Sequence, residues 1–329
     1  MLRYILNRLL MMIPVLLGVA FVVFTLMYIT PGDPAKIILG ESATEEAVTA
    51  LREEMGLNDS FVVRFARYIG DIIFRFDFGI SYVTGLGVWG ELISKFPATF
   101  KLAALSGVVS VIIGVTLGII SAIKQYSWFD NISSALGLLG VAMPNFWLGM
   151  MLVLIFAVRL KWLPASGTYG PEYWILPSIT LGMISAASIM RITRSAMLEV
   201  IRQDYIVTAR SKGQSEWVII TMHALKNAMI PIITVVGIQF GQLLGGSVLV
   251  ETVFSIPGIG RYMIDAIKAR DYPIVQGSVL FLAACFSFVN LGVDVLYSFV
   301  DPRMRTMFEH KGRSRKIKFK TNNGARNNG

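Results

Sequence analysis

Six apolar stretches, each about 20 residues long, restrict what this chain can fold into. An α-helix of about 20 apolar residues spans the hydrocarbon core of a bilayer. The stretches are Leu9–Ile29, Leu102–Ile123, Ile132–Val158, Trp174–Ile192, Ala228–Val250 and Gln276–Ser298. With 54% hydrophobic and only 16% charged residues, the chain has more apolar surface than a soluble domain can bury. We therefore expect an all-α polytopic membrane protein with about six transmembrane helices.

The first stretch follows Arg3 and Arg8, as the apolar core of a secretory signal peptide would. Its apolar core is too long for a signal peptide, and no small-x-small cleavage site follows it. We expect a retained transmembrane helix.

Basic residues are distributed unevenly between the connecting segments, and this distribution predicts the topology. If the N-terminus is inside, more than half of the 30 lysines and arginines lie on the inner side. These are Arg3, Arg8, Lys124, the basic residues from Arg191 to Lys226, and those beyond Pro302. The short outer loops hold only Arg159, Lys161, Arg261, Lys268 and Arg270. Both termini are therefore expected in the cytoplasm.

The predicted organisation has four parts: a first transmembrane helix over 1–30, an extracytoplasmic amphipathic segment over 31–97, a five-helix core over 98–300 and a basic cytoplasmic tail over 301–329. In the outer segment, Ser42 and Glu45 predict a capping box and Gly56 a helix end. The following stretch, "FVVRFARYIGDIIFRFDFG", predicts a second amphipathic helix on the membrane surface. Between the last two spans, "ETVFSIPGIGRYMIDAIKARDYP" predicts a turn and a short helix. This element is either a connector or a gate or docking surface for an outer partner.

Motifs for nucleotide or metal chemistry are missing from the sequence. No Gly-x-x-x-x-Gly-Lys-Ser/Thr loop is present, so the chain has no recognisable site for ATP phosphates. His223 and His310 lack metal-ligand spacing, and Cys285 is the single cysteine. Asp294 is the one ionisable residue recognised within a span. We expect it to pair with a basic residue such as Arg191 or Arg194, and we expect no enzymatic activity, cofactor or metal in this chain.

The fifth predicted span combines small and polar residues. Gly237, Gly241 and Gly245 recur every four residues, which favours close approach of another helix. Gln239 and Gln242 would be unsatisfied in lipid, so they are expected to face protein or an aqueous path. They are either structural contacts or part of a translocation path. Gly114 and Gly118 give the second span a weaker version of the packing motif.

The most polar long segment in the middle of the chain reads "DYIVTARSKGQSEWVIITMHALKNAMIP", from Asp204 to Pro231. It predicts two short helices, with Gly213 ending the first, Ser215 capping the second and Glu216 in its first turn. One expected helix face comprises Ile201, Tyr205, Thr208, Ala209 and Lys212. The expected apolar face of the second helix comprises Trp217, Ile220 and Ala224. Because Thr208, Ala209 and Gly213 are small, this hairpin suits close docking of a partner.

The segment "VTARSKG", followed by nine residues and "HAL", resembles the cytoplasmic coupling loop of ABC-importer permeases. The general pattern of that loop is Glu-Ala-Ala, three residues, Gly, nine residues and Ile-x-Leu-Pro. Here Val207 replaces Glu, Thr208 the first Ala, His223 the Ile and Lys226 the Pro. These departures match the peptide/nickel subfamily. The likeness extends from about Met1 to Arg305 through "TPGDPA", "FPATFKLA", "LPSITLGM", "ETVFSIPGIGRYMIDAI" and "DPRMR".

The resemblance is to the first of two paralogous permeases in a dipeptide or oligopeptide importer of a bacterial or archaeal cytoplasmic membrane. It implies that loop 191–227 docks into a cytoplasmic ATPase, which hydrolyses ATP in a separate chain. The implied partners are a second permease, two ABC ATPases and an extracytoplasmic substrate-binding protein, with membrane lipid around them and no nucleic acid. The expected coupling residues are Arg202, Asp204, Tyr205, Thr208, Ala209, Arg210, Lys212, Gly213 and Glu216.

Three alternatives remain open at the level of the sequence. The solute could be nickel, glutathione or another small molecule. The chain could instead be a channel or ion-coupled carrier that acts alone, in which case Asp294 would relay protons. It could also be a membrane scaffold without transport activity, in which case Gln239 and Gln242 would tolerate large substitutions.

Overall fold

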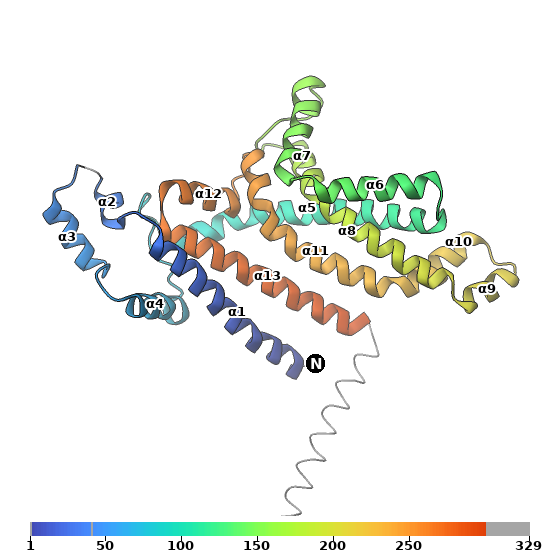
Figure 1. The fold of residues 1–329 in the computed structure, drawn as a ribbon, viewed down its shortest axis with the longest axis horizontal. Helices are drawn as coiled ribbons and strands as arrows, with labels where there is room; N and C mark the ends of the chain where they lie inside the picture. The colour runs from blue at the N-terminus through green and yellow to red at the C-terminus, as the bar shows by residue number, and fades with distance from the viewer. Residues whose placement is uncertain (1, 41, 301–329) are drawn as a thin grey trace, which may run out of the picture.

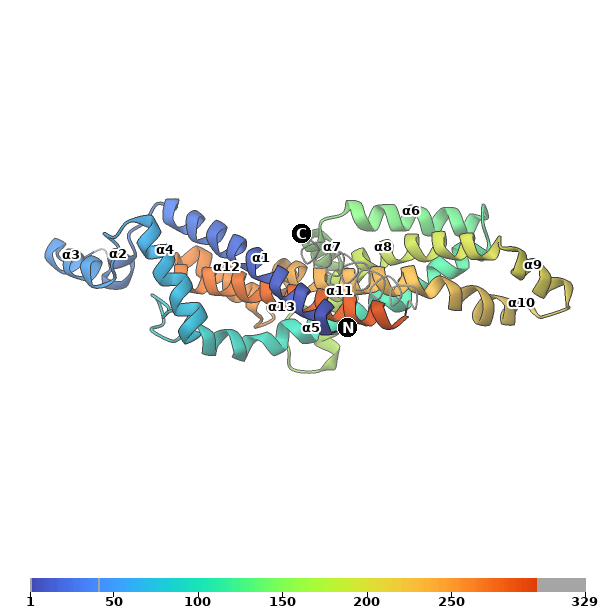
Figure 2. The ribbon, with the colours of Figure 1, turned by 90° about the horizontal axis from the view of Figure 1, so that it is seen from below.

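The computed structural model describes residues 2–40 and 42–300, and these residues are almost entirely helical (Figure 1). The only β pairing among them is one antiparallel bridge between Ile80 and Gly87. The long helices run roughly along the longest axis of the molecule, as two views at right angles show (Figures 1 and 2). The fold is all-α, as predicted. The predicted basic tail, 301–329, lies outside the described residues.

Five helices within the described range are long and apolar enough to cross a membrane. They are α1 (Leu2–Ile29), α5 (Val88–Ile123), α8 (Ile175–Ile201), α11 (Leu225–Val253) and α13 (Tyr272–Val300). A 3-10 turn, η3 (Pro171–Trp174), precedes α8. Helix α5 begins well before the predicted second span, and Pro97 lies inside it.

The third predicted span, Ile132–Val158, is not one continuous helix. It is divided into α6 (Trp128–Ala142), α7 (Asn145–Leu152) and a π-helical continuation, η2 (Val153–Arg159). The backbone is extended at Met143 because Pro144 follows it. Helix α6 runs beside α8, and α7 then turns sharply away from the bundle (Figure 1).

Small residues bring α5 and α8 into the most extensive helix pair of the described fold. A Cβ atom placed on Gly114 would lie 2.7 Å from the carbonyl oxygen of Ala186. A Cβ on Gly182 of α8 would lie 2.8 Å from the carbonyl oxygen of Ser106. Gly118 likewise faces Met190 at 2.8 Å. Gly114 and Gly118, which formed the weaker packing motif in the sequence, therefore lie at the close crossing of α5 and α8.

The glycines of α11 do not act as one packing face. A Cβ on Gly237 would collide with Val293 of α13, and one on Gly241 would lie 3.1 Å from the ring of Phe286. A Cβ on Gly245 would meet nothing within 4 Å. Two of the three predicted glycines thus allow α11 to approach α13.

The long segment predicted outside the membrane and the hairpin predicted inside it lie at opposite ends of the long axis (Figures 1 and 2). One end carries α2 (Pro34–Leu39), α3 (Glu45–Glu54), α4 (Phe61–Gly70) with its π-helical continuation η1 (Asp71–Arg75), and α12 (Ile259–Ala269). The other end carries the hairpin between α8 and α11. Helix α1 starts, and α13 ends, toward the hairpin end. We call these the outer and inner ends, following the predicted topology.

The outer helices differ from prediction at one cap. Helix α3 is capped by Thr44, whose Oγ1 accepts a hydrogen bond from the Ala47 N–H at 3.4 Å, so the predicted capping box with Ser42 is wrong. The chain leaves the helix at Gly56, with φ of +62°, as predicted. Helix α4 is amphipathic, and its aromatic side packs on α1: Phe65 contacts Phe24 with ring centroids 5.4 Å apart.

Candidate functional site

The polar hairpin at the inner end folds around a tight glycine turn. It consists of α9 (Asp204–Ser211), α10 (Glu216–Val218) and a π-helical turn, η4 (Ile219–Ala224), which continues into α11. Gly213 has φ of +77°, a conformation that favours glycine. Its N–H donates to the Arg210 carbonyl at 2.9 Å, and the Gln214 N–H donates to the Ala209 carbonyl at 3.3 Å. This is a Schellman motif, and it confirms the predicted helix end.

One side of the hairpin is buried against the bundle. Its fully or nearly fully buried residues are Ile206, Ala209, Ile219 and Ala224. They form a hydrophobic cluster with Ala122 of α5, Ala196 and Met197 of α8, and Ala228 and Ile232 of α11. The base of the hairpin is therefore fixed to three long helices at once.

The residues of the two predicted helix faces differ in their burial. Of the expected face of α9, Ala209 is buried, whereas Tyr205, Thr208 and Lys212 are exposed. In the second half, Trp217 is exposed and Ile219 takes the buried position. In the second half, the π-helical turn that begins at Ile219 has wider i→i+5 bonding, which shifts the buried side relative to an ideal 3.6-residue period.

Charged side chains connect the two halves of the hairpin. Arg210 Nε donates to Glu216 Oε1 at 2.7 Å, and Arg210 Nη2 donates to Oε2 at 3.2 Å. Hydrogen bonds to this carboxylate raise the pKa of Arg210 above its usual value. Across the turn, His223 Nε2 and Gln214 Oε1 lie 2.8 Å apart. Because the ion pair is exposed, it contributes at most about 1 kcal/mol to stability. Its main effect is to fix the position of the two halves of the hairpin relative to each other. Two of the predicted partner contacts, Arg210 and Glu216, thus pair with each other.

Large apolar side chains project from the rest of this polar element. Trp217 is 75% exposed and Met222 is 66% exposed, and Tyr205 and Val207 are also exposed. Exposed aromatic and Met side chains on a rigid, otherwise polar support are typical of a protein contact surface. We call Tyr205, Val207, Trp217 and Met222 the hairpin contact surface. The sequence contained this signal, because Trp217 directly follows the polar residues Gln214, Ser215 and Glu216.

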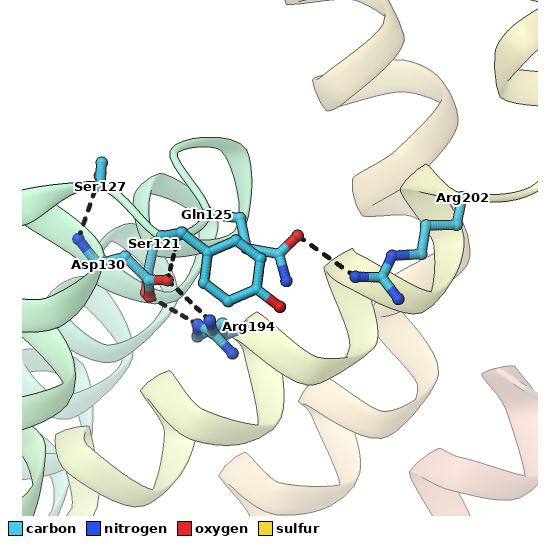
Figure 3. A network of polar contacts seen from close by, with 7 residues as sticks. Ser121, Gln125, Ser127, Asp130, Arg194 and Arg202 are labelled. Atoms are coloured by element: carbon cyan, nitrogen blue, oxygen red, sulfur yellow. Dashed lines mark hydrogen bonds and ion pairs between the residues drawn. The ribbon is translucent and has the colours of Figure 1, made fainter.

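A buried ion pair ties α6 to α8 near the hairpin (Figure 3). Arg194 donates from Nε and Nη2 to the two Asp130 carboxylate oxygens, each at 2.7 Å. Asp130 also accepts hydrogen bonds from Ser121 Oγ and from the Tyr126 N–H. The hydrogen bonds from Arg194 hold the pKa of Asp130 well below its usual range. Burial alone would raise this pKa, but the hydrogen bonds outweigh it. Arg202, one of the predicted coupling residues, donates to Gln125 Oε1 at 3.3 Å in the same region.

Asp294 pairs with a basic residue, as predicted, but the two candidate partners, Arg191 and Arg194, are wrong. Arg194 is taken by Asp130, and Asp294 pairs instead with Arg8 of α1, with Nη1 and Oδ2 3.1 Å apart. The sequence pointed to Arg191 and Arg194 because they lie near the same membrane face. The structure places α1 directly beside α13, which brings Arg8 within reach.

The two glutamines of α11 occupy different environments. Gln239 is 8% exposed and lies inside the chain, whereas Gln242 is exposed. Of the two glutamines, only Gln242 therefore lies on the surface of the chain.

Sequence reasoning missed a fully buried acidic residue in a long helix, Glu251. Its side chain is fully buried at the outer end of α11. Glu251 Oε1 accepts from Thr99 Oγ1 at 2.8 Å and from Ser247 Oγ at 2.9 Å, and Oε2 accepts from the Arg261 N–H at 3.0 Å. The glycines of "SIPGIGR" provide the space, since a Cβ on Gly258 would collide with this carboxylate. Glu251 thus joins α5, α11 and the start of α12.

Comparison with known proteins extends this description. Residues 114–306 match the family described as binding-protein-dependent transport system inner membrane component, and residues 1–103 match its N-terminal companion model. The dipeptide transport system permease protein DppB of Alkalihalophilus pseudofirmus is 44% identical over 333 residues, covering 93% of this chain and all of the relative. The glutathione transport system permease protein GsiC of Salmonella paratyphi A is 43% identical over 305 residues, covering 93% and 99%.

Solved structures show a related fold. Two crystal forms of the MetNI methionine ABC transporter in inward-facing conformations align with TM-scores of 0.53 and 0.55 at 17% identity. They cover 65% and 64% of this chain and 97% of the solved chain. From these matches, and from an all-helical bundle with a hairpin at one end, the chain belongs to the family of inner-membrane components of binding-protein-dependent transport systems.

Proposed function

We propose that this chain is the permease subunit of an ATP-driven importer for short peptides, and that its hairpin couples ATPase motion to the membrane helices. The observation that carries the coupling role is the hairpin contact surface, which exposes Trp217 and Met222 on a base buried in three helices. The peptide substrate is supported by relatives named for dipeptide and glutathione transport.

The geometry suits transmission of motion from a docked partner. Turn η4 runs without a break into α11, and the base of the hairpin packs on α8 and α5. A displacement of the hairpin therefore moves α11 and α8 together, and the Asp130–Arg194 ion pair carries α6 with α8. Such rigid-body shifts are a common way to switch between two states.

The proposed assembly contains a second, homologous permease, two cytoplasmic ABC ATPases and an extracytoplasmic substrate-binding protein. The solute crosses at the interface between the two permeases, past the exposed Gln242. ATP hydrolysis takes place in the ATPase chains. All nine predicted coupling residues lie on or beside the hairpin, with Asp204, Thr208 and Lys212 on its exposed side.

The test combines capture of the assembly in mild detergent with uptake of a radiolabelled dipeptide. Trp217→Ala is expected to lower peptide-stimulated ATPase activity and uptake at least tenfold, because an exposed Trp that becomes a contact anchor is worth about 2 kcal/mol or more. Gly213→Glu is expected to have the same effect, since a side chain there is strained at φ of +77°. The matched control is Trp162→Ala, which alters a Trp that is 70% exposed at a distant loop.

Unchanged uptake in Trp217→Ala, or an equal loss in Trp162→Ala, would refute the coupling role. The same assay run with glutathione separates the two substrate classes named for the relatives. If the captured chain transports without any ATPase, a carrier that acts alone replaces the proposal.

A further inference from the structure

A cavity at the outer end, opposite the hairpin, has a volume of about 490 Å³. It lies between α1, the segment carrying α2 to α4, and the first turns of α13. Phe24 and Met27 supply apolar wall, and Arg64, Tyr82, Tyr272 and Gln276 supply polar groups. A half-enclosed cavity of this size with a few convergent polar groups is a candidate small-ligand site.

The charges around this cavity do not cancel. Its charged lining consists of Asp33, Arg52 and Arg64. Arg52 and Asp33 form an ion pair at 3.4 Å. Among the described residues, no acidic side chain lies within ion-pairing distance of Arg64, which donates to the Leu57 carbonyl at 3.5 Å and lies 5.3 Å from the centre of the Tyr28 ring. Arg64 is therefore the lining cation without an ion pair. The nearby carboxylate of Asp271 already accepts hydrogen bonds from Ser81 Oγ and from two backbone N–H groups.

Hydrogen-bond donors accompany that charge. Tyr272 is 8% exposed, and its buried hydroxyl has no hydrogen-bond partner within the described residues. A buried hydroxyl without a partner is costly, and an acceptor bound beside it would satisfy it. Tyr82 lies beside it, with ring centroids 6.3 Å apart. Burial raises the pKa of Tyr82 to about 12, so its hydroxyl stays protonated and able to donate at neutral pH.

We propose that this cavity binds an oxyanion, a carboxylate or phosphate group, with Arg64 as the counter-charge and Tyr82 and Tyr272 as donors. A guanidinium with adjacent hydroxyl donors is the usual protein partner of such groups. A neighbouring cavity of about 660 Å³ shares Arg64 but carries the acidic Glu54, Asp71 and Asp77. The anion therefore sits on the Tyr272 side, and the remainder of the ligand extends away from the acidic wall. The source of the oxyanion is either a soluble solute or an anionic lipid headgroup.

The test uses the full chain in nanodiscs and two probes. N-acetylglycine, a soluble carboxylate, is titrated by calorimetry into protein held in phosphatidylcholine nanodiscs. Phosphatidylglycerol retention is measured separately by native mass spectrometry. Arg64→Gln is expected to weaken binding at least tenfold for whichever of the two probes binds the wild-type protein. Tyr272→Phe is expected to weaken it by about fivefold to tenfold, the value of one hydrogen bond to a charged group, without lowering the melting temperature, since the hydroxyl has no protein partner.

Arg67→Gln is the matched control, because Arg67 lies on the same helix and is already paired with Asp59 at 2.6 Å. Saturable binding of N-acetylglycine assigns the site to a soluble oxyanion, and selective retention of phosphatidylglycerol assigns it to lipid. No binding of either probe to the wild type overturns the proposal. Equal weakening by Arg64→Gln and Arg67→Gln also overturns it, because general charge attraction would then explain the binding.

Discussion

Asp130 shows how one residue can matter in a chain whose surface is mostly apolar. Its side chain is only 4% exposed, yet four hydrogen bonds satisfy the carboxylate, two of them from the same Arg194 guanidinium. Removing the carboxylate leaves the part-buried Arg194 guanidinium, whose side chain is 27% exposed, without its counter-charge. The pair also lies close to the hairpin, so its loss would loosen α6 from α8 where motion is expected to enter.

We predict that Asp130→Asn destabilises the protein by about 3 kcal/mol at neutral pH. The pKa of Asp130 is lowered in the folded protein, so its stabilisation is present above the unfolded value of about 4 and disappears as pH falls toward the folded value. The difference in melting temperature from wild type should therefore be constant between about pH 5.5 and pH 8 and shrink below about pH 4.

The control for this prediction is Asp265→Asn. Asp265 is 58% exposed and lies 3.7 Å from Arg261, so its loss should change stability by less than about 1 kcal/mol. A difference for Asp130→Asn that grows as the solution is acidified would contradict the assigned ionisation state.

At the scale of elements, the crossing of α5 and α8 depends on the absence of side chains. We predict that Gly114→Ala destabilises the bundle, because its Cβ would lie 2.7 Å from a backbone oxygen that cannot rotate away. Overpacking of this kind costs about 1 to 3 kcal/mol. Gly90→Ala, on the same helix with nothing within 4 Å of the added atom, should be neutral or stabilising. Thermal unfolding in detergent measures both, and equal melting temperatures would refute the tight crossing.

Element identity could be read from the sequence far better than element faces. Apolar length predicted all five long helices, and Gly213 predicted the hairpin turn, since both signals are local. The prediction of a continuous third span was wrong because Pro144 interrupts the helix. Hydropathy alone cannot divide the apolar run in which Pro144 lies. The predicted apolar face from Trp217 to Ala224 was wrong at Trp217 because a π-helical turn, Ile219–Ala224, interrupts the helical period between them. Glu251 was missed because its donors, such as Thr99, are distant in sequence.

At the scale of the whole molecule, the fold separates two kinds of surface along its long axis. The inner end presents a hairpin whose base is buried in the bundle, and the outer end presents short amphipathic helices around cavities. Glu251 at the outer end and Asp130 at the inner end each join several helices. A force applied to the hairpin therefore has rigid helices to act through.

This two-ended arrangement predicts the sidedness of chemical labelling. Cys285 is the single cysteine, so Cys285→Ala gives a background without reactive thiols. Glu46→Cys on α3 and Ser215→Cys on the hairpin then place one exposed thiol at each end. A membrane-impermeant maleimide should label Glu46→Cys in intact cells and Ser215→Cys only in inverted membrane vesicles. The opposite result would reverse the orientation inferred from the basic residues, and labelling of both positions from one side would refute a bundle that spans the membrane along its long axis.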